Sequence, residues 1–318
     1  MAGSTPASLS AEAPTTAVAV AQPRKARSIS PARETWRRFS RHFLAVTGAG
    51  VLLILVLAVL VGPLIWPVAI NDIDFAAKLQ GPSLAHPLGT DDLGQDVLAR
   101  MIYGGRISLA VGFAAMLVAL TVGVVVGAVA GMASGWVDAA LMWLTDLFLA
   151  LPTLPVLLLV MYLFRDSMKK VLGVEGGAFV LIVVVIGALR WMPVARLVRA
   201  QFLSLREKEF VEAARALGAS RLRQVVQHIL PNALGPVIVV GTIDVAAAII
   251  FESTLSFLGL GFPSDVPTWG SMLRDAKDYL DIAAHWALFP GGAIFLTVLA
   301  INFIGDGLRD AFDPRRVL

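Results

Sequence analysis

The most regular feature of this chain of 318 residues is a series of long apolar stretches separated by polar connections. Roughly 20 helical residues span the hydrocarbon core of a bilayer. Backbone groups in lipid must be hydrogen-bonded within their own segment, so each stretch of that length is predicted to be a helix. The pattern therefore predicts an all-α polytopic membrane protein with six transmembrane helices. The six stretches are residues 43–66, 107–133, 141–164, 177–197, 233–260 and 286–304.

Composition agrees with burial in lipid. The chain is 57% hydrophobic and 15% charged, whereas soluble domains are about half apolar and a quarter charged. It contains no cysteine, which excludes disulfides, thiolate metal sites and cysteine nucleophiles.

The first 42 residues differ in composition from the rest. Residues 1–42 are rich in Ala, Pro, Ser and Thr and become basic towards their end. Such a segment buries too little apolar surface to fold alone, so it is predicted to be a disordered tail. Its basic cluster follows the weakly apolar stretch 17–21, whereas the basic part of a signal peptide precedes the apolar part.

The distribution of Lys and Arg predicts the orientation of the helices. With both termini in the cytoplasm, the inside segments carry about twice as many Lys and Arg as the outside segments. The helical domain is then 43–304, with an external segment 67–106, a cytoplasmic loop 198–232 and a cytoplasmic tail 305–318. Basic residues beside anionic headgroups explain the net charge of +3 without nucleic acid.

The loop 198–232 has the most distinctive pattern among the connections. Apolar residues recur at helical spacing on both sides of Gly218, which suits a left-handed helix stop. Ser220 suits the N-cap of the next helix, and Pro231 marks the return to the membrane. Two short amphipathic helices are predicted. Amphipathicity alone is also typical of a helix lying on the membrane surface.

The residue pattern of this loop resembles a known one. Glu212, Ala213 and Ala214, followed by Gly218 and then Leu230-Pro231, resemble the EAA loop of importer-type ABC transporter permeases. The resemblance implies a coupling helix that enters a cleft on an ATPase subunit. The docking residues it implies are Phe210, Glu212, Ala213, Ala214, Leu217, Gly218, Leu230 and Pro231.

The resemblance covers most of the chain beyond the tail. Segments 86–96, 102–108, 252–261 and 305–315 are similar, in order, to the C-type subunit of the dipeptide and oligopeptide permease family. This implies the type I ABC importer permease fold and the bacterial plasma (inner) membrane. It also implies four partners: a homologous second permease, two cytosolic ATPase subunits and an extracytoplasmic solute-binding protein. Di- or oligopeptides are the substrates it favours, while nickel, glutathione and other small solutes stay open.

Glycines recur every four residues in and after the second stretch, at Gly123, Gly127, Gly131 and Gly135. They line one face of a helix and permit close helix packing. That face is expected to pack either against the sister permease or pore, or within this subunit.

Four charged residues fall within the apolar stretches. Buried charges in lipid usually face a partner or a water-filled path. Asp244 is the most central, so it is the candidate for lining the pore or for contacting another helix. Asp146, Arg190 and Glu252 are expected nearer the helix ends.

Catalytic chemistry is not expected. His86 precedes Asp91 and Asp92, but metal-type histidine spacing is missing, and a turn role is favoured for the aspartates. No G-x-x-x-x-G-K-[ST] loop is present, so ATP hydrolysis is expected in partner subunits. We therefore expect no catalytic residue, metal or cofactor. The rival classes are an ion-driven secondary transporter and a membrane-embedded enzyme.

Overall fold

The computed structural model describes residue 3, residues 31–133 and residues 135–313. These residues form helices, and they contain no strand. In chain order the elements are α1 (Pro31–Phe39), α2 (Phe43–Ile65), η1 (Phe75–Ala77), α3 (Val97–Met132), α4 (Trp136–Ala150), α5 (Thr153–Leu172), α6 (Val174–Ala188), α7 (Trp191–Leu205), α8 (Glu209–Ala216), α9 (Arg221–Arg223), η2 (Gln224–Ile229), α10 (Leu230–Phe257), α11 (Trp269–Ala276), η3 (Lys277–Tyr279) and α12 (Ala284–Phe312).

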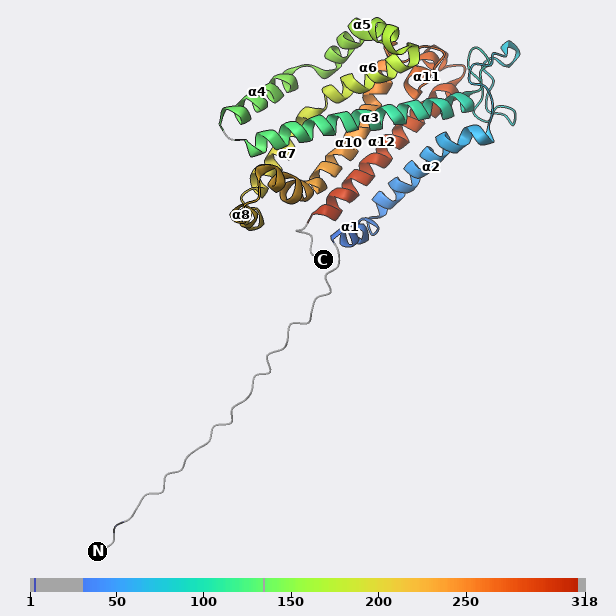
Figure 1. Cartoon of the computed structure of the whole chain (residues 1–318). Coiled ribbons are helices and arrows are strands. Elements are labelled where there is room, and N and C mark those ends of the chain that lie inside the picture. Colours follow the sequence, from blue (N-terminus) through green and yellow to red (C-terminus); the bar gives the residue numbers. More distant parts are fainter. Residues whose placement is uncertain (1–2, 4–30, 134, 314–318) are drawn as a thin grey trace.

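The long helices form one bundle around α3 (Figure 1). Helix α3 packs against α7, α10, α6 and α2, while α12 packs against α2 and α10. Helices α1 and α8 lie at one end of the bundle, here called the α8 end. Helix α11 and the connection between α2 and α3 lie at the other, here called the α11 end.

Within the described part of the chain, four helices are long and apolar enough to cross a membrane: α2, α3, the continuous helix Arg221–Phe257, and α12. Two more segments pass the same test only as bent pairs. The stretch 141–164, predicted as one helix, is instead broken into α4 and α5, which meet at 87°. The residue before a proline is disfavoured in the helical region. Leu151, which precedes Pro152, is extended with φ −74° and ψ 137°.

The stretch 177–197 is also broken. Helices α6 and α7 meet at 43°, with Arg190 at the junction at φ −121° and ψ −5°. Pro193 lies in the first turn of α7 and has no N–H to donate to the preceding turn. This break places the Arg190 side chain between helices instead of on a regular helix surface.

Two predicted boundaries also need correction. Helix α3 begins at Val97 instead of 107, because the Asp96 carboxylate caps it by accepting from the Ala99 N–H at 2.8 Å. Helix α12 continues to Phe312, so much of the predicted tail 305–318 is helical, with Ala311 buried.

Part of the predicted disordered tail is likewise folded. Residues 31–39 form α1, since Phe39 packs against Ala45 and Ala311. Residues 1–2 and 4–30 lie outside the described part of the chain, so disorder there stays a prediction.

The loop 198–232 matches its prediction only in its first half. Helix α8 is separate, but the second short helix runs on through a π-helical turn into α10. The Leu230 N–H donates to the Val225 carbonyl, five residues back. This wider turn accommodates Pro231, which lacks an N–H, so Pro231 does not interrupt the helix.

Candidate functional site

Helix α8 ends in a left-handed turn at Gly218. Its φ is +83°, a conformation that side chains other than glycine rarely adopt. The Gly218 N–H donates to the Arg215 carbonyl at 2.9 Å, and the Ala219 N–H donates to the Ala214 carbonyl at 3.0 Å. The Ser220 side chain then caps the next helix at the Arg223 N–H. The predicted stop and restart are therefore present.

The two faces of α8 have different surroundings. Val211 is fully buried in a cluster with Phe202 and Ile229, so this face fixes α8 to its own subunit. Ala214 is also buried, so it lies on the inner face and not on a surface open to a partner. Phe210 and Leu217 are exposed, at 43% and 90%.

Ala213 is also exposed on α8, and its small side chain leaves a shallow depression between Phe210 and Leu217. We call Phe210, Ala213 and Leu217 the α8 docking face. Two of the other predicted docking residues, Leu230 and Pro231, lie apart from it. Leu230 packs against the buried cluster and Pro231 is exposed at the start of α10.

A polar hollow of about 600 Å³ lies beside α8. Arginine and glutamate side chains from the α7–α8 connection, from α8 and from α9 line it, together with Met132. The charged lining residues are Arg206, Glu207, Glu212, Arg215 and Arg221. An apolar face beside a charged hollow is the composition expected where a second protein binds.

The glycine face of α3 packs within the subunit. A Cβ on Gly123 would lie 2.6 Å from Val194 Cβ, and one on Gly127 would lie 2.5 Å from the Ala195 carbonyl oxygen. Gly131 meets Phe202 in the same way. All three contacts are with α7. Of the two predicted packing partners of this face, the structure therefore has a helix of the same subunit.

Gly135 does not belong to that face, contrary to its prediction. It lies beyond the end of α3 at φ +74°, and nothing is within 4 Å of a Cβ built on it. It precedes α4 as a turn residue because its left-handed backbone conformation suits glycine.

Asp244 forms an ion pair with Arg190, at the junction of α6 and α7. The Asp244 carboxylate is 3% exposed and the Arg190 side chain 25%. Buried charges in lipid are usually paired in this way. The pair links α10 to the break between α6 and α7, while a role of Asp244 in lining the pore stays a prediction.

Glu252 lies at the centre of a buried group of hydroxyl side chains. It accepts hydrogen bonds from Ser108 Oγ at 2.9 Å and Ser256 Oγ at 2.8 Å. Ser108 also accepts from the Trp269 N–H at 3.4 Å. The group connects α3, α10 and α11. Asp146, in contrast, is 59% exposed and pairs with Arg196, which is 52% exposed.

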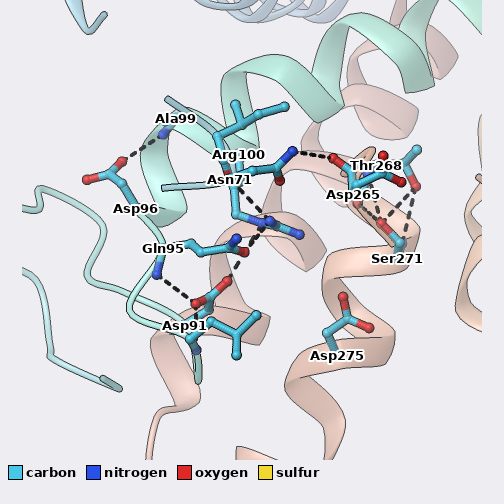
Figure 2. A network of polar contacts seen from close by, with 12 residues as sticks. Asn71, Asp91, Gln95, Asp96, Ala99, Arg100, Asp265, Thr268, Ser271 and Asp275 are labelled. Atoms are coloured by element: carbon cyan, nitrogen blue, oxygen red, sulfur yellow. Dashed lines mark hydrogen bonds and ion pairs between the residues drawn. The ribbon is translucent and has the colours of Figure 1, made fainter. Parts of the chain in front are cut away.

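A second polar site lies at the α11 end (Figure 2). The guanidinium of Arg100 lies between Asp91, Gln95 and the Ile70 carbonyl. Asp91 also accepts from the Leu93 and Gln95 N–H groups, which is the predicted turn role. Burial raises the pKa of the Asp91 carboxyl, although the bond from Gln95 and the charge of Arg100 lower it.

These residues border an open pocket of about 700 Å³. Asp92, Asp265 and Asp278 line it, together with Arg274 and Tyr279. The residues after α10 were not among the predicted site residues. Their signal in the sequence is a dense group of charges at 265–281 beside the Thr268–Ser271 capping box.

The fold and these two sites define an integral membrane transport component. The sequence profile of the family described as binding-protein-dependent transport system inner membrane component matches residues 123–317. The profile described as N-terminal TM domain of oligopeptide transport permease C matches residues 30–82. The chain belongs to this family of ABC importer permeases, which are transport components and not enzymes.

Known proteins are similar over nearly the whole chain. The oligopeptide transport system permease protein OppC of Escherichia coli K12 is 43% identical, covering 88% of this chain and 89% of its own. The dipeptide transport system permease protein DppC of Alkalihalophilus pseudofirmus is 37% identical, covering 91% of each. The glutathione transport system permease protein GsiD of Escherichia coli O6:K15:H31 is 41% identical, covering 90% and 91%.

A solved structure shares the fold. A chain from the inward-facing MetNI methionine ABC transporter aligns with a TM-score of 0.50 at 19% identity. The alignment covers 68% of this chain and 96% of that one. At this identity the likeness shows the fold alone, which is the type I ABC importer permease fold.

Proposed function

We propose that the chain forms half of the translocation pathway of a peptide importer and is driven through α8 by a separate ATPase. The other half is a homologous permease, and a solute-binding protein delivers the substrate at the α11 end. The observation that carries this proposal is an exposed apolar face on a helix that is firmly fixed to the bundle. A secondary transporter has no use for such a face, and uptake without ATP would contradict the proposal.

The membrane topology follows from counting each bent pair as one crossing. Helices α4 with α5, and α6 with α7, then complete six spans with both termini in the cytoplasm. The basic residues concentrated at the α8 end support this orientation. Reporter fusions at positions 75, 170 and 275 should read outside, and those at 138, 215 and 318 inside. One reproducible reversal would contradict the topology.

Energy transfer is proposed to run through the rigid attachment of α8. Val211 anchors the helix to α7 and η2, so force applied to the α8 docking face reaches the bundle. Phe210 and Leu217 would fill a cleft on the ATPase, and Ala213 would allow close approach. Glu212 and Arg215, at the rim of the hollow, would meet polar groups of the partner.

The test is a pair of substitutions that leave the bundle intact. Gly218→Trp puts a bulky side chain beside the docking face, and Ala213→Asp puts a charge into it without a partner. Loss of a central interface contact costs about 2 kcal/mol or more, so ATPase affinity should fall roughly thirtyfold. ATPase binding and ATP-driven uptake in reconstituted vesicles measure this, with protein amount checked by immunoblot.

Gly135→Trp is the matched control for Gly218→Trp. Both glycines have positive φ and open space around a Cβ, so the backbone strain is the same. Only Gly218 lies beside the docking face. If Gly218→Trp and Ala213→Asp both retain full ATPase binding and uptake, α8 is not the coupling element and a membrane-surface helix replaces it.

The substrate is proposed to be a di- or oligopeptide, because OppC and DppC carry those names and match over about nine-tenths of the chain. Glutathione, itself a small peptide, is the second candidate, since GsiD is similarly close. Competition for uptake by unlabelled dipeptides, longer peptides and glutathione would decide. Failure of every peptide to compete would contradict the peptide assignment.

The pocket at the α11 end is proposed as part of the contact for the solute-binding protein. The aspartates that line it outnumber the basic residues Arg100, Arg274 and Lys277, so the pocket is complementary to basic side chains. A photoreactive crosslinker attached at Asp92 or Gln95 should capture the binding protein. Crosslinks confined to this subunit would indicate that the segment only braces the helix ends.

A further inference from the structure

Helix α1 has an exposed basic face that the transport function does not use. Phe39, on one side of the helix, is buried, and Arg38 Nη1 donates to the Asp313 carbonyl at 2.9 Å. This side holds α1 against the end of α12. The exposed residues of the helix and the turn after it are Arg33, Trp36, Arg37, Ser40 and Arg41.

The three exposed arginines have no acidic partner among the described residues, whereas Arg38 is paired with Glu34 at 2.6 Å. Trp36 is 68% exposed and stacks on Phe39, with ring centroids 5.9 Å apart. A purely water-facing helix gains nothing from an exposed tryptophan. Tryptophan beside arginine is typical of the membrane–water interface.

The position of α1 along the chain fixes where this face lies. Helix α1 ends at Phe39, and α2, a candidate membrane span, begins only four residues later at Phe43. Phe43 is 78% exposed and Val46 is 47% exposed, so an apolar surface starts at once. Figure 1 shows α1 where α2 begins and α12 ends. The arginines therefore lie at the level at which the hydrocarbon layer begins.

We propose that the exposed face of α1 binds the headgroups of anionic phospholipids and anchors the α2–α12 pair at the membrane surface. Arg33, Arg37 and Arg41 would meet the phosphates, and Trp36 would lie at the boundary with the acyl chains. Contact with Gly307 couples the anchor to α12, since a Cβ there would lie 3.3 Å from the Phe39 ring. Charge complementarity selects anionic over zwitterionic lipid.

The absence of cysteine makes a site-specific probe simple. Ser40→Cys, on the exposed face, can carry an environment-sensitive fluorophore in the full transporter. The transporter is reconstituted into vesicles of phosphatidylcholine alone or of phosphatidylcholine with one quarter phosphatidylglycerol. Quenching by headgroup spin-labelled lipid is compared with quenching by aqueous acrylamide, which is uncharged. Both leaflets have one composition and no transport is needed, so the readout is independent of the proposed orientation and function.

In the anionic vesicles we expect stronger lipid quenching and protection from acrylamide, both lost at high salt. Each arginine near an anionic surface favours the bound state by about fivefold. Replacing Arg33, Arg37 and Arg41 with Gln should lower the binding constant on the order of a hundredfold. Replacing the same residues with Lys keeps the charge and should retain most of the binding.

Two results would overturn the proposal. Equal quenching in neutral and anionic vesicles would show that lipid charge is not recognised. Protection from aqueous acrylamide that is equally strong in detergent, without vesicles, would assign the face to another subunit of the transporter. Because the same labelled protein is compared in two lipid compositions, a difference between them does not reflect a folding defect of a variant.

Discussion

Gly127 and Gly218 are used for opposite physical reasons. Gly127 lies between α3 and α7, where a Cβ would come within 2.5 Å of the Ala195 carbonyl oxygen. A Cβ on Gly218 would have nothing within 4 Å of it, and glycine is needed there because φ is +83°. The α3–α7–α10 interior, including the Arg190–Asp244 pair, is thus closed by packing within the subunit. The α8 docking face, in contrast, is exposed, while the opposite side of α8 is packed against its own subunit. The interior should determine stability, and the loop should determine coupling.

The largest effect on stability is expected from the ion pair of the interior. Arg190→Ala leaves the Asp244 carboxylate buried without a partner, which costs about 3–5 kcal/mol. The melting temperature of the purified protein in detergent should fall sharply. Arg196→Ala is the control, because it breaks an exposed ion pair that contributes about 1 kcal/mol or less. Equal shifts for the two variants would contradict the picture of a closed interior.

The next effect is expected at the glycine face. Gly127→Leu forces α3 away from α7, since the new side chain meets backbone atoms that cannot move aside, and overpacking costs about 1–3 kcal/mol. Thermal unfolding and the yield of folded protein measure it. Gly50→Leu adds the same side chain to α2 in open space and should be tolerated. An unchanged melting temperature for Gly127→Leu would remove the α3–α7 contact from the interior.

A smaller and more local effect is expected at Gly218. Gly218→Ala strains a left-handed backbone by about 1 kcal/mol, which loosens the end of α8 but not the bundle. The melting temperature should stay near that of the native protein while ATP-driven uptake falls. Gly135→Ala carries the same strain away from α8 and should leave uptake unchanged. Parallel losses in both variants would break the distinction between the loop and the interior.

The smallest effect is expected from Glu212→Ala. The Glu212 side chain is exposed at the rim of the polar hollow, where a single charge contributes about 1 kcal/mol or less. Unfolding should not change, and ATPase affinity should fall by no more than about fivefold. Binding measured at two salt concentrations checks this, since a rim charge loses its effect when screened. A loss as large as that of Ala213→Asp would move Glu212 into the centre of the contact.

The amino-acid sequence alone determined the class of the molecule and the local turns. Length and apolarity of the stretches are sufficient to predict helices that cross lipid, and four of them are single long helices. The stop at Gly218 and the cap at Ser220 were predictable because both depend on residues a few positions apart. The similarity of ordered segments to peptide permeases also required no structure, and the family comparison confirms it.

Only the tertiary structure decided which neighbour each face meets. Helical spacing shows that Gly123, Gly127 and Gly131 share a face, but not that α7 covers it. Hydropathy cannot separate lipid-facing from helix-facing residues, because lipid tails are as apolar as a protein interior. For the same reason the burial of Ala214, the docking of Phe39 on α12 and the Arg190–Asp244 pair were not predictable. Each depends on contacts between residues far apart in the chain, which local pattern does not contain.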